Sequence, residues 1–333
     1  MIAHEVLYSV WRQFVRGKRQ SRAIDTFAYS LEENLHSLAY DIAARTYRHG
    51  GYQYVSVHEK KRRDLAVASV RDRLVHRYVY GQLIARYDDS FDPDVWSCRT
   101  AKGLHRALQR TQGLLGKHAG SYVWRADIMK FFDHVQHMAL MAVLGRKIDT
   151  NSELFWLCTQ IIDSYNAQSV SQSVSQSVSQ SVSQSVSRGI PIGNLTSQIF
   201  SNIYLNEFDR YVRHALKPLA YLRYGDDFIL MCSTRRDAHC MRAAAAKYLR
   251  DALGLSLNPK NDVIVPAGSG LHFLGHVIMP SYAVVDRHTS MAALQKVTVR
   301  NLASYQSLLL AKDIKKQLSW NSIDEITEIF DII

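Results

Sequence analysis

Two adjacent aspartates, Asp226 and Asp227, stand between two short apolar runs and are the first candidates for chemistry in this sequence. The runs, residues 221–224 and 228–231, flank a Gly/Asp turn, and this pattern predicts a β-hairpin. In a solvated turn the pair needs no function, because Asp is a common turn residue. Strands of Tyr, Leu, Ile and Phe would instead hold both carboxylates rigidly, and two carboxylates repel each other unless a cation neutralises them.

A third carboxylate, Asp127, directly follows the strand-like run YVWRA at residues 122–126. If this strand lies beside the predicted hairpin, Asp127 reaches the same edge of the sheet as the aspartate pair. Three carboxylates at one point suit two hard divalent cations, and we expect Mg²⁺. Two such ions would activate an attacking hydroxyl and stabilise a leaving phosphate oxygen, so the three aspartates predict in-line phosphoryl transfer.

The elements that must position these aspartates predict an α+β fold. In the middle of the chain, strands and helices alternate in the order β-α-β-β-α-β, which is the split βαβ arrangement. Apolar periodicity predicts helices over residues 31–42, 71–87, 137–164, 196–216 and 235–253, with a helical tail from about 290. Ser30 and Glu33 form a predicted capping box, and Gly50-Gly51 is expected to end that first helix. Strands are expected at 52–57 and 65–70, as a hairpin with a basic tip, and at 271–279.

Charge and composition indicate the kind of partner and the compartment. The 333 residues carry a formal net charge of +11 and a pI near 9.4, which suits a polyanion. Lys60-Lys61-Arg62-Arg63 form a dense basic run followed by Arg71, Arg73 and Arg77, although a solvated surface would explain this run equally well. No apolar run is long enough to span a bilayer, and the N-terminus lacks a signal-peptide pattern, so we expect a cytoplasmic protein that does not bind membranes.

Two further patterns carry no predicted chemistry. The four cysteines show neither a C-x-x-C pair nor zinc-ligand spacing, so we expect free thiols. Residues 168–187 are five tandem copies of QSVS, whose period of four suits neither a strand nor a helix. We interpret these copies as a flexible, exposed insertion, with a β-prone edge segment as the alternative.

Several sequence blocks, in one order, resemble those of reverse transcriptases. They are KKRRDLAV (60–67), SCRTAKGLHRAL (97–108), RADIMKFFD (125–133), GIPIGNLTSQ (189–198), YGDD (224–227), LSLNPKND (255–262) and HFLGHVI (272–278). A YGDD box alone would be weak, whereas the ordered set covers roughly residues 50–280. The resemblance implies a right-hand polymerase with fingers at 1–110, a split βαβ (RRM-like) palm at 111–280 and a short helical thumb at 281–333.

The resemblance also implies roles for single residues. Asp127, Asp226 and Asp227 match the catalytic, metal-binding aspartates, and two Mg²⁺ ions are expected. The implied nucleotide-binding residues are Lys61, Arg63, Phe132, which would exclude a ribose 2′-hydroxyl, Ile192, and Lys260, near the departing pyrophosphate. The implied primer and template residues are Tyr224, Arg99, Lys102, Ser197, Gln198 and the primer-grip turn of Phe273, Leu274 and Gly275. The phenylalanines could also be plain core residues, and Lys61, Arg63 and Lys260 plain surface charges.

One departure from the common pattern narrows the resemblance. Most reverse transcriptases carry Gln where this sequence has Ile192, and with Ser197-Gln198 the segment resembles the enzymes of diversity-generating retroelements. Such enzymes copy a template-repeat RNA into cDNA with errors at adenines, and they work with a small basic accessory protein. Ile offers shape but no hydrogen bond to the nascent pair, which would weaken discrimination. A neutral packing substitution remains the alternative.

Three other readings remain open at this point. A viral RNA-dependent RNA polymerase also carries GDD, but it commonly has Asp where this chain has Phe132. A retron or group II intron reverse transcriptase is the alternative within the family. A non-catalytic nucleic-acid-binding protein on a polymerase scaffold would keep the basic surface and would not need the three aspartates. The sequence identifies neither the primer nor the template RNA.

Overall fold

The computed structural model describes residues 4–18, 21–58, 62–167, 187–287 and 291. Within it the chain forms two compact units that each take several separate stretches of sequence. The first unit comprises Met1–Pro93, Ile128–Ala215 and Ala246–Ser256, and the second comprises Asp94–Asp127, Leu216–Ala245 and Leu257–Ile333. The predicted helical tail and most of the predicted thumb, 281–333, lie outside the described residues.

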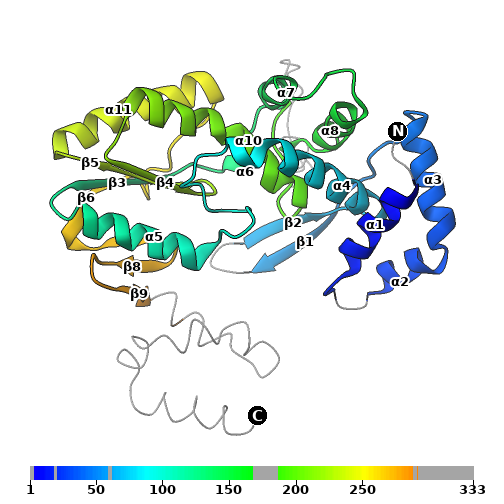
Figure 1. Cartoon of the computed structure of the whole chain (residues 1–333), viewed down its shortest axis with the longest axis horizontal. Helices are drawn as coiled ribbons and strands as arrows, with labels where there is room; N and C mark the ends of the chain where they lie inside the picture. The colour runs from blue at the N-terminus through cyan, green and yellow to red at the C-terminus, as the bar shows by residue number, and fades with distance from the viewer. Residues whose placement is uncertain (1–3, 19–20, 59–61, 168–186, 288–290, 292–333) are drawn as a thin grey trace, which may run out of the picture. The chain divides into compact units, whose positions relative to one another are not determined.

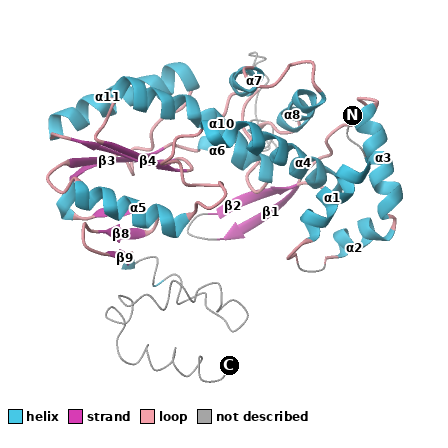
Figure 2. Cartoon of the chain, in the orientation of Figure 1, coloured by secondary structure: helices cyan, strands magenta, loops and turns pink. Residues whose placement is uncertain are grey.

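Helices predominate in the first unit, as Figure 2 shows. They are α1 (His4–Val15), α2 (Arg22–Tyr29), α3 (Leu31–Ala43), α4 (Val70–Tyr87), α6 (Phe131–His134), α7 (His137–Gly145), α8 (Glu153–Asp163) and α10 (Leu195–Tyr211), with a 3₁₀ turn at Asp88–Ser90 and a π turn at Val212–Leu216. Helix α4 is central, because it packs against α1, α8 and α10. Its Leu74, Val79 and Leu83 are fully buried, and the side chain of Ser69 caps its first turn by accepting from the Asp72 amide.

Three predicted details of these helices differ in the structure. Ser30 precedes α3 but makes no capping hydrogen bond, because it also ends α2 and its φ of −117° and ψ of 46° are not the extended N-cap geometry. The helix ends at Ala43, well before Gly50. The helical region expected over 137–164 is two helices, since Ser152 starts α8 afresh by accepting from the Phe155 amide at 3.1 Å.

The basic hairpin is confirmed, with a shifted second strand. Strands β1 (Gln53–His58) and β2 (Arg62–Val67) pair antiparallel, with Val57 opposite Arg63 and His58 opposite Arg62. Arg62 and Arg63 therefore belong to the strand and not to the tip, since the ladder continues past the predicted start at Leu65. Lys61 lies outside the described residues.

The second unit is built on a four-stranded antiparallel sheet in the order β4-β5-β3-β6. Its strands are β3 (Tyr122–Asp127), β4 (Ala220–Tyr224), β5 (Asp227–Cys232) and β6 (Val263–Pro266). Helix α5 (Leu104–Lys117) covers one face, and α11 (Arg235–Leu253), of which 235–245 belong to this unit, lies over the other (Figure 1). The predicted α+β fold with a split βαβ core is thus confirmed.

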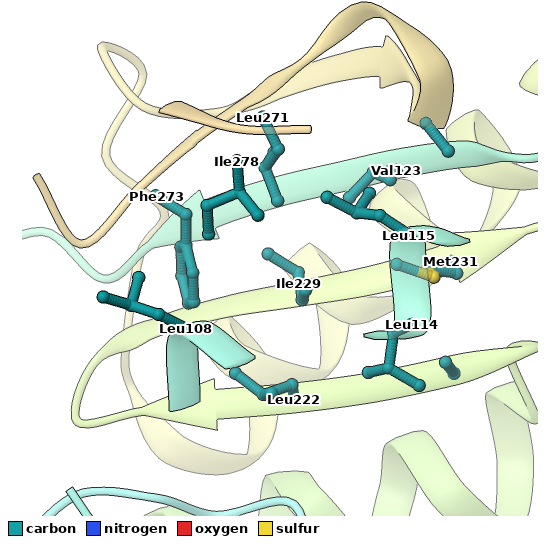
Figure 3. Packing of buried hydrophobic residues seen from close by; sticks show 12 residues of the cluster. Leu108, Leu114, Leu115, Val123, Leu222, Ile229, Met231, Leu271, Phe273 and Ile278 are labelled. Carbon is teal, nitrogen blue, oxygen red and sulfur yellow. The ribbon is translucent and has the colours of Figure 1, made fainter. Parts of the chain in front are cut away.

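A second, smaller sheet packs beside α5. The predicted single strand at 271–279 is instead two strands, β7 (Leu271–Phe273) and β8 (His276–Ile278), and β9 (Ala283–Val285) follows. The chain reverses between β7 and β8 because Leu274 and Gly275 take φ values of 51° and 76°. Figure 3 shows the shared core, in which Leu115, Ile229 and Phe273 come from α5, the large sheet and the small sheet.

Two further observations concern the state of the cysteines and the hydropathy of the helices. Cys98, Cys158, Cys232 and Cys240 are free thiols. Among the described residues, no helix is both long and apolar enough to cross a membrane.

Candidate active site

The β4–β5 hairpin carries the aspartate pair at a tightly held turn. Gly225 and Asp226 are the two turn residues, and Gly225 has a φ of 67°, which glycine adopts without a Cβ clash. The Gly225 amide donates to Ser97 Oγ at 2.9 Å, and the fully buried Arg223 donates through Nη1 to the Gly225 carbonyl at 2.9 Å. The turn that presents Asp226 is therefore fixed from both sides.

Ser97 reaches this turn because residues 94–97 run beside β4. The Arg223 amide donates to the Asp94 carbonyl at 2.9 Å, and the Trp96 amide donates to the Arg223 carbonyl at 2.9 Å. Neither Ser97 nor Arg223 was predicted as a site residue. The signal for Arg223 was present, since an Arg amid apolar strand residues must be buried with partners.

The sheet register places Asp127 directly opposite Asp227 on neighbouring strands. Like charges that face each other across an antiparallel pair destabilise a sheet. Arg125, two residues earlier on the same face of β3, places Nη2 3.3 Å from Asp227 Oδ1. Burial raises the pKa of Asp227, the guanidinium of Arg125 opposes that rise, and the charge of Asp127 adds to it. The pair is therefore incompletely neutralised by the protein itself.

The two oxygens of Asp127 have different surroundings. Oδ2 accepts from Asn258 Nδ2 at 3.2 Å and from Asn261 Nδ2 at 2.9 Å. Oδ1 is buried and has no hydrogen-bond partner among the described residues. A buried carboxylate oxygen without a donor is costly, so this position is suited to a cation.

These residues fit a divalent metal ion in a particular way. In the described part of the chain, no three Asp, Glu, His or Cys side chains are close enough together to surround one ion. Mg²⁺ does not require such a cage, because it keeps several waters and takes one or two carboxylates together with substrate phosphates. Asp127 Oδ1 and the facing Asp227 supply that kind of partial oxygen set, with Asp226 in the adjoining turn.

A comparison with protein families identifies the family of the chain. The family model described as "Reverse transcriptase (RNA-dependent DNA polymerase)" matches residues 55–278, which is more than half of the chain. The chain belongs to the reverse transcriptase family. All three aspartates of this reverse transcriptase lie within the matched residues.

Individual relatives agree with this family. The chain is 24% identical over 294 residues to "Protein YkfC" of Escherichia coli (strain K12), covering 78% of this chain and 74% of that protein. Among solved structures, it matches apo telomerase from Candida tropicalis at a TM-score of 0.50, with 14% identity over 76% of this chain. Telomerase from Candida albicans, solved in complex with the TWJ fragment of telomeric RNA, matches at 0.51, with 10% identity over 98% of this chain.

The telomerase matches bear on the fold alone. The chain spans 60% and 58% of the two telomerase chains, so it corresponds to only part of each of them. Together with the family match, they confirm the predicted right-hand polymerase architecture. Members of this family generally use divalent metal ions, typically Mg²⁺.

The other predicted residues of the second unit lie on its strands and on the loops and turns that connect its elements. Tyr224 pairs with Asp227 across the hairpin, and burial raises the pKa of its phenol. Lys102 places Nζ 4.0 Å from the centroid of the Trp96 ring. Phe273 is buried, with its ring centroid 6.0 Å from Arg125 Cζ, and Leu274 and Gly275 form the β7–β8 turn. Arg99 donates to the Val95 carbonyl at 3.4 Å, and Lys260 is exposed in the turn before β6.

The remaining described candidates belong to the first unit, where hydrogen bonds link three of its segments. The Phe132 carbonyl accepts from the Ile190 amide at 2.8 Å, and the Ile192 carbonyl accepts from the Ala66 amide at 3.0 Å. Asn194 Nδ2 donates to the Ala66 carbonyl at 2.8 Å, so the GIPIGN segment is seated along β2. Three further candidates of this unit are Arg63 in β2, Ser197, buried in the first turn of α10, and Gln198, exposed beside it.

Proposed function

We propose that this chain is an RNA-templated DNA polymerase that adds deoxynucleotides to a primer by two-metal phosphoryl transfer. The observation that supports this most is the pairing of Asp127 with Asp227 across β3 and β5. One buried oxygen of Asp127 also has no donor among the described residues. In a member of the reverse transcriptase family, this is where metal-dependent chemistry is expected.

The chain's own residues would divide the work as follows. Asp127, Asp226 and Asp227 would hold two Mg²⁺ ions. When bound, such ions lower the pKa of the primer hydroxyl and neutralise charge on the phosphate. Arg125 favours the ionised form of Asp227 by its charge, and the hydrogen bonds to Gly225 keep the turn with Asp226 in place.

We assign substrate selection to the residues that the family resemblance implies. Phe132 would exclude a ribose 2′-hydroxyl, and its half-buried ring meets that of Phe131 edge-on at a centroid distance of 5.3 Å. Lys61, Arg63 and Lys260 would bind the triphosphate and pyrophosphate. Tyr224, Arg99, Lys102 and the turn of Phe273, Leu274 and Gly275 would contact primer and template. Fingers (1–110), palm (111–280) and thumb (281–333) remain our proposed division of labour.

We further propose that the enzyme serves a diversity-generating retroelement, copying a template-repeat RNA with errors at adenines. The supporting observation is Ile192, which has no side-chain donor or acceptor and whose carbonyl is already bonded to Ala66. A small basic accessory protein would supply phosphate contacts in addition to those of this basic chain. The setting would be the cytoplasm.

Sequencing of cDNA made on a defined RNA template tests this subtype. We expect errors concentrated opposite template adenine, and we expect Ile192→Gln to reduce them, because a Gln amide restores polar contacts to the nascent pair. Leu195→Gln, in the same segment, is a matched control that should leave the error spectrum unchanged. Evenly distributed errors in the wild-type products would favour a retron or group II intron type enzyme.

A protein of another class remains the second candidate. A non-catalytic nucleic-acid-binding protein would bind template RNA equally well with Asp226→Asn, and neither form would extend a primer. The retained aspartates and the unpartnered oxygen of Asp127 favour the enzyme, because a binding protein has no need for either.

A further inference from the structure

The turn between α11 and β6 brings two amide side chains to one oxygen of a catalytic aspartate. Asn258 and Asn261 both donate to Asp127 Oδ2, at 3.2 and 2.9 Å. The main chain fixes this turn to the end of β3, since the Asn258 amide donates to the Asp127 carbonyl at 2.9 Å. Side chain and backbone thus hold Asp127 from the same turn.

The orientation of the Asn258 amide follows from its other hydrogen bonds. Its Oδ1 accepts from the Lys260 backbone amide at 3.2 Å, and its own carbonyl accepts from the Asn261 amide at 3.1 Å. With Oδ1 engaged inside the turn, the NH₂ group is the part that faces the carboxylate. A flipped amide would lose the bond to Lys260 and place two acceptors against each other.

The two facing aspartates are thereby stabilised by different chemistry. Arg125 meets Asp227 with a full positive charge, whereas Asp127 meets only neutral amides and its Oδ1 meets no donor in the described structure. A cationic neighbour competes with a metal ion for a carboxylate, while an amide orients the carboxylate and leaves its charge available. The terminal torsion of Asp is soft, so without such donors the carboxylate would rotate freely.

We propose that Asn258 and Asn261 are positioning residues that hold Asp127 Oδ2 so that Oδ1 is presented to a divalent metal ion. This inference rests on the proposed function, because it assumes that Asp127 is a metal ligand. Outer donors of this kind typically change metal affinity or activity 10- to 100-fold when they are removed. We therefore expect weaker metal binding, with the fold intact, when either amide is lost.

The test is a Mn²⁺ titration of the full chain without nucleic acid, followed by electron paramagnetic resonance of the free ion. Asn261→Leu keeps the branched shape of the side chain and removes the donor, and we expect its Kd for Mn²⁺ to rise about tenfold. Asn258→Ser keeps a side-chain oxygen that can accept from the Lys260 amide and removes the amide donor without adding a charge, so it serves if Asn261→Leu folds poorly. Asn261→Gln, which restores an amide, should recover part of the affinity, and Pro259→Ala, in the same exposed turn, should bind as the wild type does.

Primer extension provides the second readout. The Mg²⁺ concentration for half-maximal rate should rise in the two variants that remove an amide donor, at Asn258 and at Asn261. High Mg²⁺ should partly restore their activity. Wild-type Mn²⁺ affinity and Mg²⁺ requirement in both variants would overturn the positioning role while leaving the polymerase intact. If the wild type itself shows neither Mn²⁺ binding that depends on Asp127 nor extension, the proposed function fails, and this inference fails with it.

Discussion

At the scale of single residues, the three aspartates of the site are not equivalent. Asp227 forms an ion pair with Arg125, and Asp127 accepts hydrogen bonds from two side-chain amides. Asp226 lies in a turn that Ser97 and Arg223 hold by hydrogen bonds. The aspartates themselves could be predicted from the sequence, because a doubled Asp between apolar runs is conspicuous. The asparagines could not, since Asn in a turn is ordinary and only the sheet register brings them to Asp127.

Phe132 provides a prediction about a single side chain. Phe132→Ala would open the space that a ribose 2′-hydroxyl needs, so we expect the preference for deoxynucleotides over ribonucleotides to fall about tenfold or more, through better use of ribonucleotides. Single-nucleotide incorporation with each substrate measures this ratio. Phe131→Leu, a change of the buried neighbouring ring, is the control. An unchanged preference for deoxynucleotides in Phe132→Ala would contradict the role of Phe132 in excluding the ribose 2′-hydroxyl.

At the scale of elements, the patterns with a clear period were predictable and the interruptions were not. Strand β3, the β4–β5 hairpin and α11 follow apolar runs or helical spacing, and they position the site. The apolar pattern predicted one strand through Leu274 and Gly275, because apolar residues continue through the reversal and only a left-handed backbone breaks the strand. The family resemblance, in contrast, implied a turn at these residues. The start of β2 was missed because charged Arg62 and Arg63 resemble a loop, although backbone pairing does not exclude them.

Helix α4 contains a buried histidine that should make stability depend on pH. His76 is 1% exposed and lies between His49 and Thr196, with its ring nitrogens 2.9 Å from His49 Nε2 and 2.5 Å from Thr196 Oγ1. Burial, and then the charge of His49, lower the pKa of His76 from 6.5 to about 3, with Asp72 acting in the opposite direction. Between these two values the unfolded chain binds a proton that the folded chain does not.

Stability should therefore be complete above pH 6.5 and decrease as the pH falls toward 3. From pH 7.5 to 5.5, His76 should account for a loss of about 1.4 kcal/mol in the free energy of unfolding. Urea unfolding at both pH values measures the loss, and His76→Gln should show a smaller one, because Gln does not titrate. Equal losses in the two proteins would mean that His76 is not kept neutral by the fold.

Hydrogen bonds link the described residues on the two sides of the QSVS segment, of which residues 168–186 lie outside the described part of the chain. The Ala167 amide donates to the Arg188 carbonyl at 3.0 Å, and the His137 amide donates to the Ser187 carbonyl at 3.2 Å. The repeat therefore connects two positions that are already hydrogen-bonded neighbours. Its sequence has no charged residue and no His or Cys.

Deleting two copies, residues 168–175, should change neither folding nor synthesis appreciably. A shorter loop costs less closure entropy, so the free energy of unfolding should rise by less than about 1 kcal/mol. Chemical unfolding and primer extension measure the two effects. Loss of synthesis in a protein of normal stability would show that the repeats take part in function.

At the scale of the whole molecule, the family was predictable and the biological role was not. Ordered blocks over residues 50–280 predicted a reverse transcriptase, and the family match over 55–278 confirms it. The diversity-generating subtype rests on a few side chains such as Ile192, whose effect depends on a bound nucleotide and template. The sequence of this chain also does not identify a partner protein or a template.

The charge of the whole chain predicts how template binding responds to salt. With a net charge of +11 and a pI near 9.4, much of the affinity for RNA should come from phosphate contacts and counterion release. The logarithm of the RNA binding constant should fall linearly with the logarithm of salt concentration, by about 0.7 per phosphate contacted on a single strand. Fluorescence anisotropy from low to physiological salt measures the slope, with the unfolding temperature over the same range as control. A flat response would exclude an electrostatic template surface.

The most direct test of the central claim is primer extension on a defined RNA template, with deoxynucleotides and Mg²⁺, for the wild type and for Asp127→Asn and Asp226→Asn. We expect the wild type to extend the primer, and we expect each variant to bind the template normally and to lose at least about a thousandfold in rate, since metal-dependent chemistry fails without its carboxylates. Extension by either variant at near wild-type rate would contradict the account, as would a wild type that binds RNA and makes no DNA.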